Sequence, residues 1–330
     1  MAPKGFIGFA IRKVSGAVLT IFIIICVNFV LFRLVPGDPV RMMFGDPRVS
    51  PERIREMYEQ FGLSGTLWEQ FTAYLRQLFL YGDLGQSFSR GAPVLEVIAD
   101  RIPQTVILVL TALIIAVVTG TMLGAIAGWK TGTRFDSIII TLSLGMYAIP
   151  AFALGIIALL IFAFYLGIFP LGGMETVQSG LTGWSYWKDV LWHMSLPILA
   201  IVVWYIGEYV IVTRNAMQDT LDQDYILAAR AKGLKGSAIL RRHALRNAIL
   251  PVVTITGVNV AFAVAGVIQV EAVFRWPGLG RLMYESVMRR DYPVLQGLFL
   301  LFGLAVVLAN LTVDLIYGYI DPRIKVGGDE

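Results

Sequence analysis

The chain has 330 residues, of which 57% are hydrophobic and only 15% are charged. Soluble domains carry about 25% charged residues, so this composition excludes an ordinary soluble protein and indicates an all-α polytopic membrane protein. The formal net charge of +4 matches the usual excess of cations in cytoplasmic loops, and we expect no nucleic-acid partner.

The apolar residues gather into six runs, each near the ~20 residues that a helix needs to cross a bilayer. We therefore predict six transmembrane helices at residues 14–35, 104–129, 137–166, 196–213, 251–270 and 294–320. The first run, which contains the single Cys26, is too long for the core of a signal peptide and is expected to be retained. Pro150 in the third run predicts a kink.

Residues 36–103, between the first two runs, are predicted to form a small extracytoplasmic helical insertion. Ser50 is a suitable N-cap and Pro51 a suitable first helical residue. Apolar residues then recur at helical spacing, at positions 54, 57, 61, 68, 71, 75 and 78. We expect their apolar face to pack on the membrane domain. Its role is open between a structural spacer and a substrate contact.

Lysine and arginine in the short loops predict the orientation of the spans. The loops on the side of the two termini carry 14 of these residues, and the short loops on the other side carry 5. Residues 1–35 therefore comprise a cytoplasmic N-terminus and the first helix, and residues 321–330 a cytoplasmic tail. Residues 104–320 are expected to form the core of five helices. The basic residues between positions 275 and 290 run weakly against this orientation.

The basic loop of residues 214–250 faces the cytoplasm and is predicted to begin with a short helix over residues 222–232. Residues at the spacing i, i+3, i+4, i+7 on one face of it are Tyr225, Ala228, Ala229 and Lys232. Acidic residues at its start and basic residues at its end complement the helix dipole. Gly233 supplies the usual residue for a left-handed stop.

A helix of about ten residues is marginal in water, so this one requires a surface to pack on. The small Ala228 and Ala229 would permit close approach to a groove of another subunit, whereas the cations would equally suit a segment lying on anionic lipid. The residues alone leave both possibilities open. A second helix is expected near residues 237–247, with Ser237 as its N-cap and the next span starting at Pro251.

This loop resembles the EAA loop of ABC importer permeases, whose pattern is Glu-Ala-Ala, three residues, Gly, and later Ile-x-Leu-Pro. Ala228-Ala229 and Gly233 are in register, and Ala248-Ile249-Leu250-Pro251 stands at the end. Leu227 replaces the glutamate and the spacer is longer, and both departures resemble the dipeptide/oligopeptide/nickel branch of these permeases. Further ordered matches are Pro36-Gly37-Asp38-Pro39, Gly82-Asp83-Leu84-Gly85 with Ser87, Trp276-Pro277-Gly278-Leu279-Gly280, Arg290-Asp291-Tyr292-Pro293 and Asp321-Pro322-Arg323.

The resemblance implies the type I ABC importer permease fold in a prokaryotic inner or plasma membrane. It implies a heterodimer with a second homologous permease, two cytoplasmic ATPase subunits that bind ATP and Mg, and an extracytoplasmic substrate-binding protein. The loop would then be a coupling loop seated in a groove of one ATPase. Its coupling residues would be Tyr225, Ala228, Ala229, Arg230, Lys232, Gly233 and Leu234.

No catalytic residue, metal or cofactor is expected on this chain. It contains no G-x-x-x-x-G-K-[ST] phosphate-binding motif, so ATP would be handled by a partner. His193 and His243 are isolated from one another and from cysteine, which argues against a metal site. We expect a transport subunit and not an enzyme.

Four polar residues in or near the spans are candidates for the pathway or its gate: Glu208, Asn259, Gln269 and Glu271. A charge in mid-bilayer costs about 2.5–3.5 kcal/mol on insertion scales, so Glu208 is the most conspicuous of them. It would either contact the amino group of a peptide or line the pathway. Alternatively, it would lie near the cytoplasmic end of its helix and pair with Arg214 or snorkel to the membrane interface, and we favour this second interpretation. Glu271, with Arg275, is expected at the outer mouth.

Peptides are the substrate class that the resemblance favours, with oligosaccharides, glutathione and nickel complexes as alternatives. A membrane-anchored scaffold without transport is one competing function, and the expected kinks and intramembrane polar residues argue against it. A secondary transporter is the other. Such proteins carry paired inverted repeats and buried ionisable residues near mid-membrane. Glu208 alone gives little support to that alternative.

Overall fold

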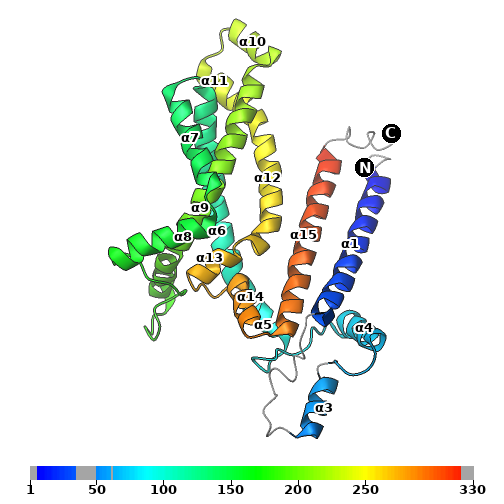
Figure 1. Cartoon of the computed structure of the whole chain (residues 1–330). Helices are drawn as coiled ribbons and strands as arrows, with labels where there is room; N and C mark the ends of the chain where they lie inside the picture. Colours follow the sequence, from blue (N-terminus) through cyan, green and yellow to red (C-terminus); the bar gives the residue numbers. More distant parts are fainter. Residues whose placement is uncertain (1–5, 35–49, 61, 321–330) are drawn as a thin grey trace. The chain divides into compact units, whose positions relative to one another are not determined.

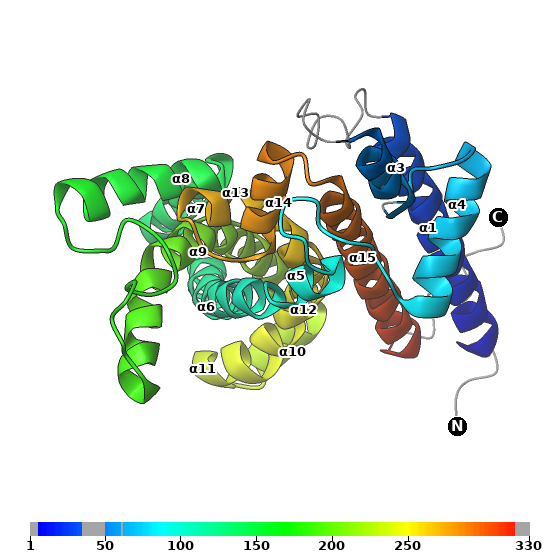
Figure 2. The same ribbon diagram turned by 90° about the horizontal axis from the view of Figure 1, so that it is seen from below.

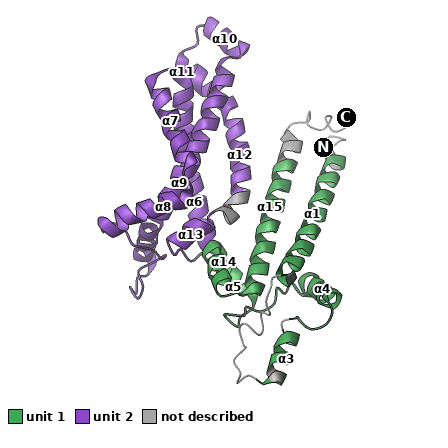
Figure 3. Cartoon of the chain, in the orientation of Figure 1, with its two compact units in different colours: residues 1–103, 278–330 green, residues 104–277 purple. Residues whose placement is uncertain are grey.

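The computed structural model describes residues 6–34, 50–60 and 62–320, without the side chains of residues 6, 7, 34, 51, 53, 60, 261–266 and 316–320. Throughout this part of the chain the regular structure is helical, apart from one bridge between Gln86 and Pro93. The predicted all-α class is therefore confirmed. The helices form two compact units, Met1–Pro103 with Gly278–Glu330, and Gln104–Pro277 (Figure 3).

The first unit is built around two long helices, α1 and α15, that run side by side (Figures 1 and 2). Its helices are α1 (Phe6–Leu34), α3 (Pro51–Gln60), α4 (Leu67–Arg76), α5 (Val94–Ala99), α14 (Leu279–Met288) and α15 (Tyr292–Ile320). Lys13 Nζ of α1 lies 2.8 Å from Asp314 Oδ2 of α15. Nearer the other end of the pair, Asn28 donates a hydrogen bond of 2.9 Å to the carbonyl of Gln296. Polar contacts therefore fasten the long pair at both ends.

Helix α4 packs on α1 through aromatic rings. It begins with a capping box, in which the Glu69 N–H donates to the Thr66 hydroxyl at 3.3 Å and the Thr66 N–H donates to the Glu69 carboxylate at 2.7 Å. These hydrogen bonds from Thr66 hold the pKa of the Glu69 carboxyl below its ordinary value. Phe71 and Tyr74 then contact Phe29 of α1, with ring centroids 5.1 and 5.8 Å apart. The extracytoplasmic position of this insertion stays a prediction.

The second unit is organised by its longest helix, α9. Its helices are α6 (Ile102–Trp129), α7 (Arg134–Ala148), α8 (Ala151–Ala158), α9 (Gly183–Leu221), α10 (Asp224–Ala231), α11 (Gly236–Ile239), α12 (Leu245–Gly266) and α13 (Ile268–Val273). Helix α9 packs against α7, α8, α12 and α13. It begins well before the predicted start at residue 196, because hydropathy marks the apolar stretch of a helix and not its ends.

Helix α6 approaches α9 closely along a row of glycines. A Cβ atom at Gly120, Gly124 or Gly128 would lie 2.5–2.6 Å from an atom of α9. These positions are four residues apart, so they fall on one face of α6. Small residues on such a face allow two backbones to pack more tightly than larger side chains would permit.

Four described helices are long and apolar enough to cross a membrane, and they lie at Gly8–Arg33, Val94–Trp129, Gly183–Leu221 and Tyr292–Leu315. A fifth candidate joins α7 to the helix Ala151–Tyr165, which is bent by 95° at the break. The predicted kink near Pro150 is confirmed. It is sharp because Ile149, the residue before the proline, is extended and ends α7. The remaining predicted span, residues 251–270, falls on α12 and α13, and a total of six stays a prediction.

Candidate functional site

Helix α10 stands at one end of the second unit (Figure 1) and ends in a Schellman motif. The N–H of Leu234 donates to the carbonyl of Ala229 at 3.3 Å, and the N–H of Gly233 donates to that of Arg230 at 2.9 Å. Gly233 has φ +75°, a left-handed conformation that glycine adopts without strain. The predicted glycine stop is confirmed.

One face of α10 is buried against its own chain. Ile226 and Ala229 pack with Ile239 of α11, and Trp129 at the end of α6 covers this cluster. Ala229 is only 6% exposed, so the expectation that both alanines face a partner is wrong for Ala229. Its small side chain instead allows α10 to lie close to the following helix. Ala229 therefore fixes the position of α10 from inside the unit.

The opposite face of α10 is exposed and mixes apolar with cationic side chains. Six of the exposed residues of the helix and of the turn that follows it are Tyr225, Leu227, Ala228, Arg230, Lys232 and Leu234. Leu227 is 67% exposed, and Tyr225 and Leu234 are each 42% exposed. We call these six residues the α10 surface. Exposed apolar side chains ringed by charges are typical of a surface that meets another protein.

The second helix of the loop differs from the prediction at both ends. It starts at Gly236 with Lys235 in the N-cap position, so Ser237 is not the cap. It continues through a π-helical segment, Leu240–Ala244, directly into α12, and Pro251 lies inside that helix. A proline early in a long helix is tolerated where neighbouring helices support the backbone. Helix α11 therefore runs into α12 without a break in the helix.

Arg214 pairs with Asp136 and not with Glu208, so the expected pairing of Glu208 with Arg214 is wrong. Its Nε and Nη2 atoms donate to the two carboxylate oxygens of Asp136 at 3.0 and 2.8 Å. Asp136, at the start of α7, is buried and also accepts a hydrogen bond from the N–H of Gly132. This bidentate ion pair joins the start of α7 to the part of α9 that leads to α10.

Glu208 and Asn259 are brought together by the packing of α9 and α12. Asn259 Nδ2 donates to Glu208 Oε2 at 2.8 Å and also lies 3.2 Å from the Tyr209 hydroxyl. Gln269 lies apart from this pair, on a cavity of about 330 Å³ at the break between α7 and α8. Two of the four pathway candidates therefore touch each other, and a third faces a cavity of the same unit.

The fourth candidate, Glu271, is not at an open mouth. It is completely buried, and its Oε1 atom accepts a hydrogen bond of 2.7 Å from Thr105 of α6. The neighbouring Trp276 is also buried and donates to the carbonyl of Gln104 at 2.9 Å. These contacts fasten the end of the second unit to the start of α6. Burial argues against a direct contact of Glu271 with a binding protein, and its role in a gate stays a prediction.

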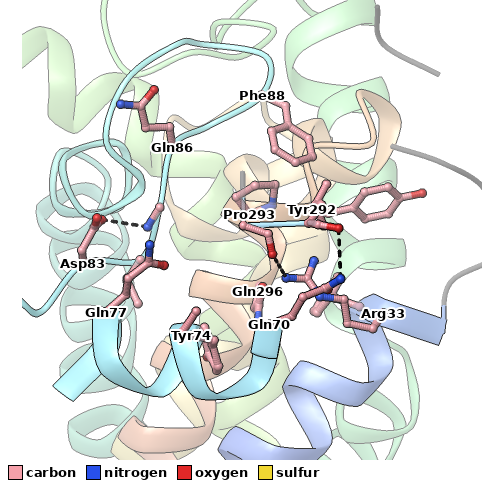
Figure 4. Close-up of a pocket in the computed structure, with 16 residues that line it drawn as sticks. Arg33, Gln70, Tyr74, Gln77, Asp83, Gln86, Phe88, Tyr292, Pro293 and Gln296 are labelled. Atoms are coloured by element: carbon pink, nitrogen blue, oxygen red, sulfur yellow. Dashed lines mark hydrogen bonds between the residues drawn. The ribbon is translucent and has the colours of Figure 1, made fainter. Parts of the chain in front are cut away.

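A polar cavity of about 170 Å³ lies in the first unit, among α1, α4, α15 and the loop after α4 (Figure 4). Arg33 donates to the carbonyl of Gly62 at 3.1 Å on one side of it. On the other side, Asp83 accepts a hydrogen bond of 2.8 Å from the N–H of Gly85. Burial raises the pKa of the Tyr74 phenol in its wall, so this hydroxyl stays neutral. The Gly82–Gly85 motif is therefore part of a packed, polar corner of the unit.

Asp291 is a buried residue whose role could not be inferred from the sequence. Its carboxylate accepts hydrogen bonds from the hydroxyls of Ser87 and Ser89 at 2.5 and 2.6 Å. It also accepts from the N–H groups of Phe88 and Ser89 at 3.0 and 3.1 Å. The two motifs that meet here are about 200 residues apart in the chain, and no local pattern connects them. Asp291 fixes the loop after α4 to the start of α15.

Comparison with known proteins gives matches along almost the whole chain. Residues 120–326 match the family described as binding-protein-dependent transport system inner membrane component, and residues 6–109 match the N-terminal part described for such membrane components.

Three relatives show how far the similarity extends. The dipeptide transport system permease protein DppB of Escherichia coli (strain K12) is 35% identical, with 96% of this chain and 98% of the relative covered. The di/tripeptide transport system permease protein DppB of Pseudomonas aeruginosa (strain UCBPP-PA14) is 34% identical over 97% of this chain and 99% of its own length. The oligopeptide transport system permease protein AppB of Bacillus subtilis (strain 168) is 35% identical, with coverage of 96% and 99%.

Proposed function

The chain belongs to the family of binding-protein-dependent transport system inner membrane components, and from this premise we propose that it imports peptides as a permease subunit. As a member of this family it is a transport subunit and not itself an enzyme. The peptide class is supported by the names of its full-length relatives, which are dipeptide, di/tripeptide and oligopeptide permeases.

We propose that the α10 surface docks in a groove of a cytoplasmic ATPase subunit. The observation that carries this proposal is the Schellman-capped helix α10, buried on one face and exposed on the other. A rigid helix transmits a displacement that a disordered loop would absorb. The continuous path from α11 into α12, and the Arg214–Asp136 pair on α9, would carry that displacement into the second unit.

The remaining partners follow from the same proposal. A second homologous permease would supply the other half of the pathway, and two ATPases would bind ATP and Mg. An extracytoplasmic binding protein would deliver the peptide. Both termini would face the cytoplasm, as the distribution of cations in the loops indicates.

The test is uptake by the complete transporter in proteoliposomes that contain both permeases and both ATPases, with the binding protein outside. We expect a labelled tripeptide to accumulate only when ATP is enclosed. Accumulation driven by an ion gradient without ATP would overturn the proposal in favour of a secondary transporter.

The substrate class is tested in the same vesicles by competition. Unlabelled peptides should reduce the uptake of the labelled tripeptide, whereas oligosaccharides, glutathione and nickel complexes should not. Because the binding protein selects the cargo, its affinity for each compound is measured separately. Preferred transport of any of these other compounds would change the substrate class while leaving the ATP-driven mechanism in place.

A further inference from the structure

Four aromatic side chains form a continuous row in the second unit. The rings of Tyr147 and Trp204 are stacked with centroids 6.0 Å apart, and Trp204 and Tyr205 follow at 4.8 Å. Tyr205 and Tyr209 continue the row at 6.5 Å. The first three rings also line the cavity of about 330 Å³ that Gln269 faces. Aromatic side chains with polar edges therefore form one wall of a cavity beside the break between α7 and α8.

Glu208 continues this wall by one helical turn. Ile201, Trp204 and Tyr205 of α9 line the cavity, and Glu208 follows them at the spacing i, i+3, i+4, i+7. Residues at this spacing share one face of a helix. Irregular backbone at membrane depth, such as the break at Pro150, is tolerated where it borders a cavity or is buried in protein.

The carboxylate of Glu208 has no cationic partner among the described residues. It accepts a hydrogen bond from the amide of Asn259, which is neutral, and Arg214 is engaged by Asp136. The stretch of α12 that follows Asn259, residues 261–266, contains no ionisable residue in its sequence. An ionisable residue in a membrane helix usually marks a substrate or ion pathway.

We propose that Glu208 and the aromatic row hold the protonated amino terminus of a peptide during its passage. A carboxylate makes its strongest hydrogen bonds with a cation, and the faces of Trp204 and the tyrosines attract an ammonium group. This inference rests on the proposed import of peptides.

Replacing Glu208 with glutamine separates this role from a purely structural one. Glutamine keeps an oxygen that can accept the Asn259 hydrogen bond, so the tie between α9 and α12 persists, but the negative charge is lost. A structural role predicts little change in Glu208→Gln. A role in holding an ammonium group predicts a large change that depends on the charge of the substrate.

The experiment measures ATP-driven uptake of trialanine by the complete transporter, at equal loading of the binding protein, at about pH 6.5 and about pH 9, on either side of the ~7.7–8.0 pKa of an α-amino group. In the wild type we expect uptake to fall at the higher pH. Glu208→Gln should reduce uptake about tenfold at the lower pH, as expected for loss of a hydrogen bond to a charged group, and should abolish the pH dependence. Glu208→Asp should keep the pH dependence, and Glu96→Gln, at an exposed position of α5, should behave as the wild type.

Wild-type uptake with wild-type pH dependence in Glu208→Gln would overturn this inference and leave peptide import intact. Absence of peptide uptake in the wild type would instead overturn the proposed function, and this inference with it. If Glu208→Gln fails to accumulate in the membrane, Trp204→Leu tests the same wall, with Trp184→Leu as the control because Trp184 is 69% exposed. Trp204→Leu should then reduce uptake several-fold, and unchanged uptake would overturn the inference.

Discussion

At the scale of single residues, Gly233 determines where α10 ends. Its φ of +75° lies in the left-handed region. A Cβ atom added at this position would have no atom within 4 Å apart from those of the adjacent residues. A substitution is therefore opposed by the backbone conformation and not by crowding. Asparagine tolerates this conformation better than other residues with a side chain, and β-branched residues tolerate it worst.

We expect Gly233→Val to destabilise the end of α10 by roughly 1–2 kcal/mol and to lower peptide-stimulated ATP hydrolysis and uptake. Gly233→Asn is the matched control and should retain most activity. Both variants should insert at wild-type levels, measured by their amounts in purified membranes. Normal uptake by Gly233→Val would contradict the role assigned to the helix end.

The Arg214–Asp136 ion pair is a second stabilising feature at the scale of single residues. Removing one member of a buried pair costs about 3–5 kcal/mol, because the other charge is left buried and unpaired. Since Arg214 is partly exposed, with 22% of its side chain accessible, we expect the lower end of that range.

Arg214→Gln and Asp136→Asn should each lower the melting temperature of the purified subunit in detergent. The double variant should be less destabilised than the sum of the two, because neither neutral side chain then leaves a charge behind. Additive losses would show that the two residues do not stabilise each other.

At the scale of elements, the face of α6 that meets α9 is determined by the absence of side chains. A Cβ at Gly124 would lie 2.6 Å from the carbonyl oxygen of Val210 and 2.8 Å from the Thr213 Cβ. Neither atom is the mobile end of a long side chain, so the two helices would have to move apart.

Gly124→Ala should therefore destabilise the subunit by about 1–3 kcal/mol, the usual range for overpacking. The control is Gly145→Ala in α7, where no atom lies within 4 Å of the new Cβ and alanine favours the helix. Thermal melting of the two variants side by side gives the comparison. A Gly124→Ala variant as stable as Gly145→Ala would show that α6 and α9 separate without cost.

At the scale of the whole molecule, the α10 surface is the feature that remains unexplained by the chain alone. Its exposed apolar side chains, Tyr225, Leu227 and Leu234, belong to α10 and the turn after it, at one end of the second unit (Figure 1). Burying them against a partner removes apolar area from water, at about 25 cal/mol per Å².

We expect Leu227→Asp to abolish co-purification of the ATPase subunits without affecting insertion. The control is Val177→Asp, an equivalent change at a residue that is 84% exposed in the loop between α8 and α9. Co-purification of tagged ATPases with each variant is the measurement. If Leu227→Asp retained the ATPases as the wild type does, docking would not depend on the apolar part of the α10 surface.

Much of the fold was predictable because its signals are local. Runs of apolar residues located the long helices, Pro150 marked the break between α7 and α8, and Gly233 marked the end of α10. Each of these depends on the chemistry of a residue and its immediate neighbours. Ends of helices in polar surroundings were missed, as at Gly183 and at the junction of α11 with α12, since these ends depend on packing.

By itself the sequence determined the all-α class, the broken third span, the capped helix of the basic loop and the family resemblance that the comparisons confirmed. The tertiary structure alone decided which polar residues meet: Arg214 with Asp136, Glu208 with Asn259, Glu271 with Thr105. It also decided that Ala229 faces inward and Leu227 outward. The physical reason is that a charge buried by folding takes whichever partner the packing of distant helices brings within hydrogen-bond reach. The residues next to a charged residue in the sequence therefore do not identify its partner.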